Sequence, residues 1–586
     1  MQEPRPQWFF QPRVTRNGSR GGEGDPLPGL IDVPAAVLRR HGAKELDPGT
    51  AAAVHDRAQP RPTVYRTRTL LVPADLVQQA PKVRAINEVL AGVGMTLRPP
   101  APERLPDLDD NADLARELAR LPRPAVLAPA RDSRTPTVVD AWPALQALRA
   151  AVTRPPHGAG AEAPLDQADV DRISLEHLLV GSAIEGSPAG HSGGGLTGGT
   201  NGGSGVTGPG TTDSYTYSGG DTRTPVTVLL DPPDRGSPGK YGRRPVIAVL
   251  DTGVRAHPWL DVRPRPGGGY DTVPDGFTAL DRVIQQAILT EGRKARERGD
   301  RQRQLIRNAW DRPVAADPLV GELDTDSGHG TFISGIVRQI APQAKVLALR
   351  VMHSDGTVYE GDLICALRHL AVRIAQAQAG DPDEMVDVVS LSLGYFDETR
   401  HDEEFTSGLW QVIEILLGMG VIVVAAAGNY STSRRFYPAA FATKTPPAGL
   451  PVISVGALNP NGSKAIFSDG GDWITAWASG AAVVSTMPAD VNASRTPAIR
   501  MREHPANPVP PGGRWPPYRE SLDADDYSGL FGAWSGTSFS APLLAAHVAR
   551  ALLTEAGQSG RKLTSCGTQD TLDRARAALT LMKWPG

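Results

Sequence analysis

Three short motifs of this 586-residue chain contain residue types that together can activate a hydroxyl group as a nucleophile. Asp251 follows an apolar run, His329 lies within the small-residue stretch 327–335, and Ser538 lies within 536–542. A serine hydroxyl is a poor nucleophile unless a base removes its proton, and imidazole ionises in the right pH range to do so. A carboxylate can then orient the imidazole and stabilise its protonated form. The three motifs therefore predict one nucleophilic site if the fold brings them together.

Each motif alone has a more ordinary interpretation. An Asp after a strand is usually a turn or cap residue, a single His is usually structural, and a Ser at a helix start is usually an N-cap. The order Asp251, His329, Ser538 in glycine-rich surroundings, with Asn429 between the last two, favours catalysis. Ser538 also opens a helical run, where free N–H groups and the positive helix end favour a developing oxyanion.

The elements that must position these residues are those of an α/β fold. Short, nearly continuous apolar runs alternate with helical segments, which is typical of a parallel sheet buried on both faces. The carboxyl ends of such strands open into a binding crevice. The expected strands are Val246–Leu250, Lys345–Val351, Val386–Leu393, Val421–Ala427 and Val452–Ala457, and the expected helices are Glu360–Ala379, Glu404–Leu417 and Leu543–Ala556.

The same motifs give the chain a resemblance to the subtilase family of subtilisin-like serine peptidases, over about residues 240 to 556. The motifs that carry the resemblance are Asp251-Thr-Gly253, His329-Gly-Thr331 and Gly536-Thr-Ser538-Phe-Ser-Ala-Pro542. The resemblance implies a serine endopeptidase with a subtilisin-like parallel sheet flanked by helices. It acts on peptide or protein substrates and needs no cofactor and no metal.

The resemblance also implies a role for each matching residue. Asp251 orients the base, His329 is the general base and then the acid, and Ser538 is the nucleophile. Asn429 corresponds to the oxyanion-hole asparagine of the family. Ser392, Leu393 and Gly394 resemble the strand along which the substrate backbone lies. We expect activity at neutral to mildly alkaline pH, because protonated His329 cannot take the serine proton.

Some stretches depart from the family pattern. The chain runs quickly from His329 to Pro342, so we expect no calcium site there. Phe436 is bulky where relatives have a small residue near the primary specificity pocket, so the pocket is expected to be restricted. The charged stretch 291–307, inside a long insertion, is interpreted as a solvated helical face rather than a docking or nucleic-acid surface.

The composition of the chain changes along its length. A small α+β unit precedes a Gly/Ser/Thr-rich stretch, which behaves as a flexible linker because little apolar surface offsets its ordering entropy. In the unit we expect strands at Val64–Val72, Pro124–Ala128 and Ile173–Val180 and helices at Ala74–Leu90 and Asp140–Val152. The predicted domains are an irregular segment 1–60, the α+β domain 61–182, the linker 183–238 and the catalytic domain 239–586 with insertions at about 262–322 and 486–530.

The α+β domain has two interpretations, and the sequence leaves both open. A small strand-and-helix domain before a tether resembles the inhibitory, fold-assisting propeptide of subtilases, which would occlude the cleft until cleavage in or near the linker. It would then act as an intramolecular inhibitor, and the chain would be a zymogen. Alternatively, the domain stays attached and binds a partner.

Charge and composition exclude several other classes. The formal net charge is −3, so no basic field points to nucleic acid or to an anionic membrane. Cys365 and Cys566, the two cysteines, exclude a disulfide-dense scaffold and a multi-cysteine metal site, and leave one disulfide or two free thiols open. The N-terminus lacks the apolar stretch of a signal peptide, and the longest apolar run, 415–428, is too short to span a membrane. We therefore expect a soluble, cytoplasmic protein.

Two competing functions remain to be weighed. Asp251-Thr-Gly and Asp326-Ser-Gly fit an aspartic peptidase, but that fold is mostly β and would leave His329 and Ser538 without roles. The alternative from another class is a catalytically silent interaction protein on the subtilase fold.

Overall fold

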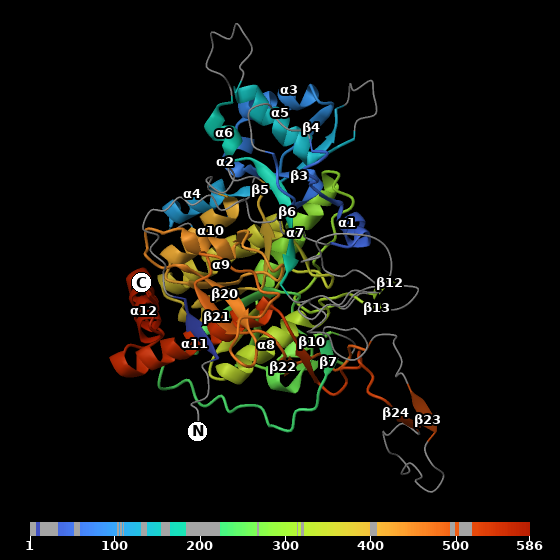
Figure 1. Ribbon diagram of the computed structural model, residues 1–586. Coiled ribbons are helices and arrows are strands. Elements are labelled where there is room, and N and C mark those ends of the chain that lie inside the picture. The colour runs from blue at the N-terminus through green and yellow to red at the C-terminus, as the bar shows by residue number, and fades with distance from the viewer. Residues whose placement is uncertain are drawn as a thin grey trace, which may run out of the picture.

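A computed structural model of the chain contains two large sheets with helices packed around them (Figure 1). Most of the predicted linker 183–238 lies outside the described residues. The structure describes residues 7–11, 33–51, 59–101, 105, 108, 111–130, 138–153, 165–182, 223–266, 269–312, 315–317, 322–398, 407–492, 499–502 and 518–585.

The first sheet includes the strand that ends at Asp251. Its neighbouring strands are parallel except for β1, which pairs antiparallel with β21 at one edge. The central strands are buried along their whole length, which explains their continuous apolar sequences. The predicted α/β class is confirmed. The strand order is β1 (Trp8–Phe10), β21 (Ala476–Ser479), β20 (Val452–Leu458), β18 (Ile422–Ala426), β16 (Val388–Leu391), β8 (Val246–Asp251), β14 (Lys345–Arg350) and β11 (Thr278–Leu280).

Helices cover both faces of this sheet (Figure 1). On one face lie α8 (His329–Ile340) and α11 (Thr537–Ser559), with α12 (Thr568–Leu581) packed on α11. On the other lie α7 (Arg282–Glu297), α9 (Glu360–Ala379) and α10 (Gly408–Gly418). The predicted bounds of α9 are confirmed. Helix α10 begins later than predicted because Ser407 caps it through the Trp410 N–H, and residues 404–406 lie outside the described part of the chain.

The second sheet is antiparallel and joins the N-terminal part of the chain to the catalytic part. We call strand β2 together with residues 64–181 the N-terminal unit. Strands β2 to β6 come from this unit, and β15, β17 and β19 come from the catalytic part. In Figure 1, β6 runs from the N-terminal unit into the catalytic part. The path is β19 (Phe436–Tyr437), β17 (Leu393–Phe396), β6 (Ser174–Gly181), β3 (Val64–Pro73), β5 (Pro122–Pro129) and β4 (Met95–Arg98), with β15 (Thr357–Tyr359) on β6 and β2 (Ala43–Glu45) on β3.

The N-terminal unit has a hydrophobic core of its own. Its three predicted strands are confirmed as β3, β5 and β6, and its second predicted helix as α5. The first predicted helix is two helices, because Pro81 lacks the N–H that would continue α2 into α3. The helices of the unit are α2 (Ala74–Val77), α3 (Ala80–Ala91), α4 (Ala112–Arg120), α5 (Ala141–Thr153) and α6 (Gln167–Asp171).

Two sequence interpretations are wrong. The segment 1–60 is not irregular throughout, because β1, α1 (Ala35–His41) and β2 lie within it and are held by pairing and packing against distant parts of the chain. The charged stretch 291–307 is not solvated throughout, since Glu291, Asp300 and Arg303 are buried and paired with charges of the N-terminal unit. Other charges of the stretch, such as Arg293 and Glu297, are exposed. The domain boundaries themselves stay predictions.

The remaining strands are short and lie in the insertions and connections. They are β7 (Arg223–Pro225), β9 (Val262–Pro264), β10 (Tyr270–Thr272), β12 (Ala315–Asp317), β13 (Glu322–Leu323), β22 (Val483–Thr486), β23 (Arg500–Arg502), β24 (Tyr518–Glu520) and β25 (Phe531–Trp534). Cys365 and Cys566 are both buried and are not joined by a disulfide. None of the helices in the described part of the chain has the length and apolar character needed to cross a membrane.

Candidate active site

Asp251 and His329 form a buried hydrogen-bonded pair. Asp251 ends β8 and His329 begins α8, and the imidazole Nδ1 lies 2.8 and 2.9 Å from the two carboxylate oxygens. The two segments approach so closely that a Cβ on Gly330 would lie 2.1 Å from the carbonyl oxygen of Gly253. The small residues of both motifs are therefore what allows the acid and the base to meet.

The surroundings of His329 are anionic. Burial disfavours the charged imidazolium, but the charge and hydrogen bond of Asp251 and the other nearby carboxylates together outweigh burial and raise the pKa of His329 above its ordinary value of 6.5. Asp326 and Asp311 act in the same direction. Burial raises the pKa of each of these two carboxyl groups to about 6.

Ser538 lies close to the Asp251–His329 pair. It is the second residue of α11, and the ring of the next residue, Phe539, packs 5.5 Å from the His329 ring. The Ser538 hydroxyl donates to the carbonyl oxygen of Ser392 at 3.2 Å. The Nε2 atom of His329 is buried and has no hydrogen-bond partner among the described residues. The atom that would accept the serine proton is thus unoccupied.

A peptide carbonyl of the chain itself lies against both Ser538 and Asn429. The carbonyl oxygen of Ser182, which directly follows β6, accepts from Asn429 Nδ2 at 2.5 Å and from the Ser538 N–H at 2.9 Å. The Asn429 amide is oriented by Thr537, whose N–H and hydroxyl both donate to Asn429 Oδ1 at 2.9 Å. Two donors from different elements therefore converge on one carbonyl.

The residues before Ser182 lie between two strands of the catalytic part. On one side Leu393 and Gly394 of β17 pair with Gly181 and Val180, and the Ser182 N–H donates to Ser392 O at 3.0 Å. On the other side Thr357–Tyr359 of β15 pairs with residues 178–180, and the Gly181 N–H donates to Gly356 O at 2.8 Å. The predicted strand 392–394 thus holds an extended segment, and that segment belongs to the chain itself.

The Ser182 side chain is fully enclosed. Phe436 packs directly against Gly394 and Gly428: a Cβ on Gly394 would lie 2.4 Å from the Phe436 ring, and one on Gly428 would lie 3.1 Å from it. Phe436 is itself buried against Phe396. This arrangement agrees with the expected restriction of the pocket, whose role stays a prediction.

Comparison with known proteins decides the family. The sequence profile of the Subtilase family matches residues 242–574, more than half of the chain, and includes all three motifs. The chain belongs to the subtilase family. The thermophilic serine proteinase of Bacillus sp. (strain AK1) is 29% identical over 277 residues, covering 47% of this chain and 53% of that protein. Serine protease AprX of Bacillus subtilis (strain 168) is 27% identical over 241 residues, 38% of this chain and 46% of that protein.

Thermitase of Thermoactinomyces vulgaris is 29% identical over 201 residues, which cover 31% of this chain and 63% of that protein. The matched region of this subtilase spans about half the length of the thermophilic serine proteinase. The N-terminal unit lies outside the matched family region. The proteinase names of these relatives therefore bear on the catalytic part alone.

Sequence reasoning missed the residues that fill the cleft of this subtilase. The segment 178–182 gave no signal beyond a predicted strand that ends at Val180, and β15 is a three-residue strand formed only by tertiary pairing. Strand Val386–Leu393, predicted as one, is two strands with Ser392 between them. That break is where the chain leaves the central sheet and enters the cleft.

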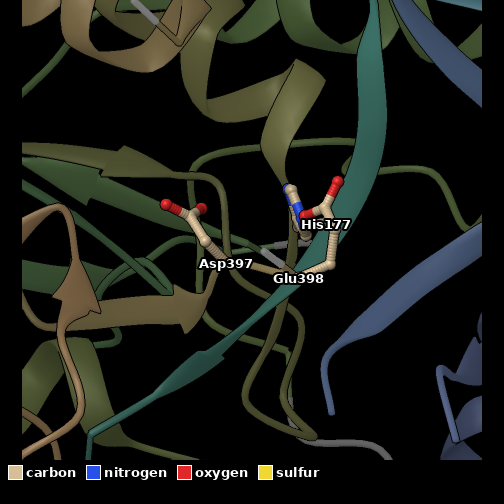
Figure 2. A group of neighbouring side chains, drawn as sticks. All are labelled: His177, Asp397 and Glu398. Carbon is tan, nitrogen blue, oxygen red and sulfur yellow. The ribbon is translucent and has the colours of Figure 1, made fainter. Parts of the chain in front are cut away.

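One group of side chains in the described residues has the types and spacing of a metal site. It consists of His177, Asp397 and Glu398 (Figure 2). However, the two ring nitrogens of His177 lie 2.8 Å from Glu360 and 2.9 Å from Glu398, so each nitrogen faces a carboxylate oxygen. Both nitrogens must then donate, and an imidazolium has no lone pair for a metal. The expectation that no cofactor or calcium is needed stays a prediction.

Proposed function

We propose that this subtilase is a serine endopeptidase in which Ser538, His329 and Asp251 are catalytic residues and Asn429 is an oxyanion donor. The observation that carries the proposal is the Ser182 carbonyl held between Asn429 Nδ2 and the Ser538 N–H. That is the geometry required to stabilise a tetrahedral oxyanion at an attacked peptide bond. The comparisons support it, and nothing in them favours a catalytically silent protein.

The reaction follows from the positions of these groups. The Ser538 hydroxyl turns from the Ser392 carbonyl toward His329, gives its proton to Nε2 and attacks the carbonyl carbon. The negative charge passes to the oxygen held by Asn429 and the Ser538 N–H. The protonated His329, stabilised by Asp251, then gives the proton to the leaving amine, and an ester joins Ser538 to the acyl fragment. Water, activated by the same imidazole, hydrolyses the ester.

We further propose that the N-terminal unit is an intramolecular inhibitor and that the bond cleaved first is Ser182–Ala183. The segment ending at Ser182 uses both cleft strands and both oxyanion donors, so no other substrate can bind while it is in place. It fits closely, because a Cβ on Gly181 would lie 3.0 Å from the Asp326 carboxylate. The predicted linker 183–238 begins directly after this bond, in agreement with cleavage at its start. Peptides and proteins are the proposed substrates, and the predicted cytoplasmic location stays a prediction.

The purified wild-type chain and the Ser538→Ala variant test this proposal side by side. We expect the wild type to yield a fragment whose new N-terminus is Ala183, and the variant to remain at 62.1 kDa. A serine-directed fluorophosphonate should label Ser538 of the cleaved wild type and leave the variant unlabelled. Intact wild-type chain that hydrolyses added peptides would contradict self-cleavage, whereas absent labelling and absent hydrolysis would contradict the enzymatic function.

The rate is expected to depend on the ionisation of His329. Because its pKa is raised above 6.5, kcat/KM should fall about tenfold per pH unit below a midpoint that lies above pH 6.5. The Asp326→Asn variant should move this midpoint to lower pH, since the Asp326 carboxylate raises the pKa of His329. Peptide hydrolysis by the self-cleaved protein from about pH 5 to 9 measures both profiles. A profile flat from about pH 5 to 8 would exclude His329 as the base.

Phe436 is expected to limit the residue that precedes the cleaved bond to small side chains such as serine. In the Phe436→Val variant, kcat/KM for a peptide with Leu at that position should rise at least about tenfold relative to the Ser peptide. The thermal unfolding of the variant checks that it is folded, because shortening a buried ring also costs stability. An unchanged Leu-to-Ser ratio in the folded variant would assign the restriction to another residue.

A further inference from the structure

His177 occupies the far end of the cleft. It lies on β6 directly before residues 178–182, and is the sixth residue before the bond proposed to be cleaved. Its ring is buried, with Nδ1 2.8 Å from Glu360 Oε2 and Nε2 2.9 Å from Glu398 Oε2. Figure 2 shows the His177 side chain beside Glu398 and Asp397. The cleft therefore encloses this side chain in the same way as it encloses Ser182.

The groups around His177 are those that bind a cation. Burial opposes protonation of the imidazole, but Glu360 and Glu398 outweigh it and raise the pKa of His177 well above its ordinary value. The ring of Tyr395 stacks on the imidazole with the two ring centroids 4.3 Å apart. Two carboxylates and an aromatic face give a positive charge both ion pairs and a cation–π contact.

The anionic and cationic halves of this contact come from different parts of the chain. Glu360 begins α9, where the helix dipole favours a negative charge, and Glu398 follows β17, both in the catalytic part. Burial disfavours ionised Glu398, but His177 and Arg149 outweigh it and lower its pKa to about 2. His177 and Arg149 both belong to the N-terminal unit. When that unit leaves, the carboxylates lose the cation that pairs with them.

We propose that Glu360, Glu398 and the ring of Tyr395 form a subsite that binds a cationic side chain at the sixth residue before the cleaved bond. The inference rests on the proposed function, because the N-terminal segment marks the path of a substrate. A substrate of the freed enzyme then carries Lys, Arg or protonated His at this position. Leaving two buried carboxylates without a counter-charge is costly, so peptides that lack the cation bind and react poorly.

A peptide series based on residues 175–184 of this chain tests the subsite with the self-cleaved protein. The residue that corresponds to His177 is replaced by Lys, by norleucine, which has a similar unbranched apolar chain without the charge, or by Glu. We expect kcat/KM for the Lys peptide to exceed that for the norleucine peptide about tenfold or more, and the Glu peptide to be the poorest. Adding salt should reduce the Lys advantage only partly, because buried pairs are screened weakly.

Two variants and one matched control show which carboxylates cause the preference for a cationic side chain. Glu360→Gln and Glu398→Gln should each reduce the ratio of Lys to norleucine peptide cleavage several-fold, by lowering the Lys rate and raising the norleucine rate, because one carboxylate fewer is left without a counter-charge. Glu384→Gln is the control, since Glu384 lies beyond the C-terminal end of α9 and pairs with Arg373. It should leave the ratio as in the wild type.

The outcomes separate the subsite from the proposed function. Cleavage of every peptide at similar rates overturns the subsite and leaves the endopeptidase proposal standing. Cleavage of none, with no labelling of Ser538, overturns both. A Lys preference that persists in both Glu variants also overturns the assignment. A preference for the His peptide that appears only with added Zn²⁺ and disappears with a chelator would replace the charge subsite by a metal site.

Discussion

Replacing Asn429 with alanine is expected to lower kcat for peptide hydrolysis about 100- to 1,000-fold while changing KM little, which is the range typical of one oxyanion-hole donor. The side-chain amide of Asn429 donates to the Ser182 carbonyl at 2.5 Å, and Thr537 fixes its orientation through Oδ1. This hydrogen bond becomes stronger as the carbonyl oxygen gains charge, so its loss raises the barrier more than it weakens binding. Steady-state kinetics of the self-cleaved protein measures the effect.

The Asn459→Ala variant is the matched control. Asn459 is only partly buried, and its side-chain amide donates to the Ser463 hydroxyl and to the Lys464 carbonyl within its own turn. Its kcat should stay within about twofold of the wild type. If Asn429→Ala raised KM and left kcat unchanged, Asn429 would be a ground-state binding residue and not an oxyanion donor.

The sequence was sufficient to predict an element wherever the apolar pattern of that element reflects its burial in the fold. Strand β8 is apolar up to Leu250 because both faces are covered, and α9 has the bounds that its pattern predicted. Asp251, His329, Ser538 and Asn429 could be identified because their motifs resemble those of the subtilase family. In the motifs of Asp251 and His329 the glycines also have a physical reason, since two backbones approach closely there. Local sequence therefore specified the elements and the candidate catalytic groups.

The sequence could not indicate contacts between distant segments. The charges of 291–307 look like a solvated surface because a sequence shows no counter-charges, and their partners lie more than a hundred residues away in the N-terminal unit. Strand β1 is three residues long and exists only through pairing with β21. The segment 178–182 fills the cleft because β15 and β17 offer unpaired edges, and edge pairing depends on the fold rather than on local propensity.

The buried charges between the two units lead to the prediction with the largest effect on stability. The Arg66 guanidinium is 1% exposed and donates to both carboxylate oxygens of Asp300 at 2.8 and 2.9 Å, while Glu176 lies 3.7 Å away. Removing it leaves buried carboxylates without their cation. In a Ser538→Ala background, which prevents self-cleavage, Arg66→Ala should lower the free energy of unfolding by about 3–5 kcal/mol.

Urea-induced unfolding followed by tryptophan fluorescence measures this change, and Arg116→Ala is its matched control. Arg116 pairs with Asp113 on the surface of α4, where both side chains are exposed, so its loss should change the free energy by less than about 0.5 kcal/mol. Similar effects for the two arginines would mean that water reaches the Arg66 site. The Arg66–Asp300 pair would then do little to hold the N-terminal unit, whose release after cleavage at Ser182 would still break the buried pairs of Glu291 with Arg123 and of Arg303 with Glu176.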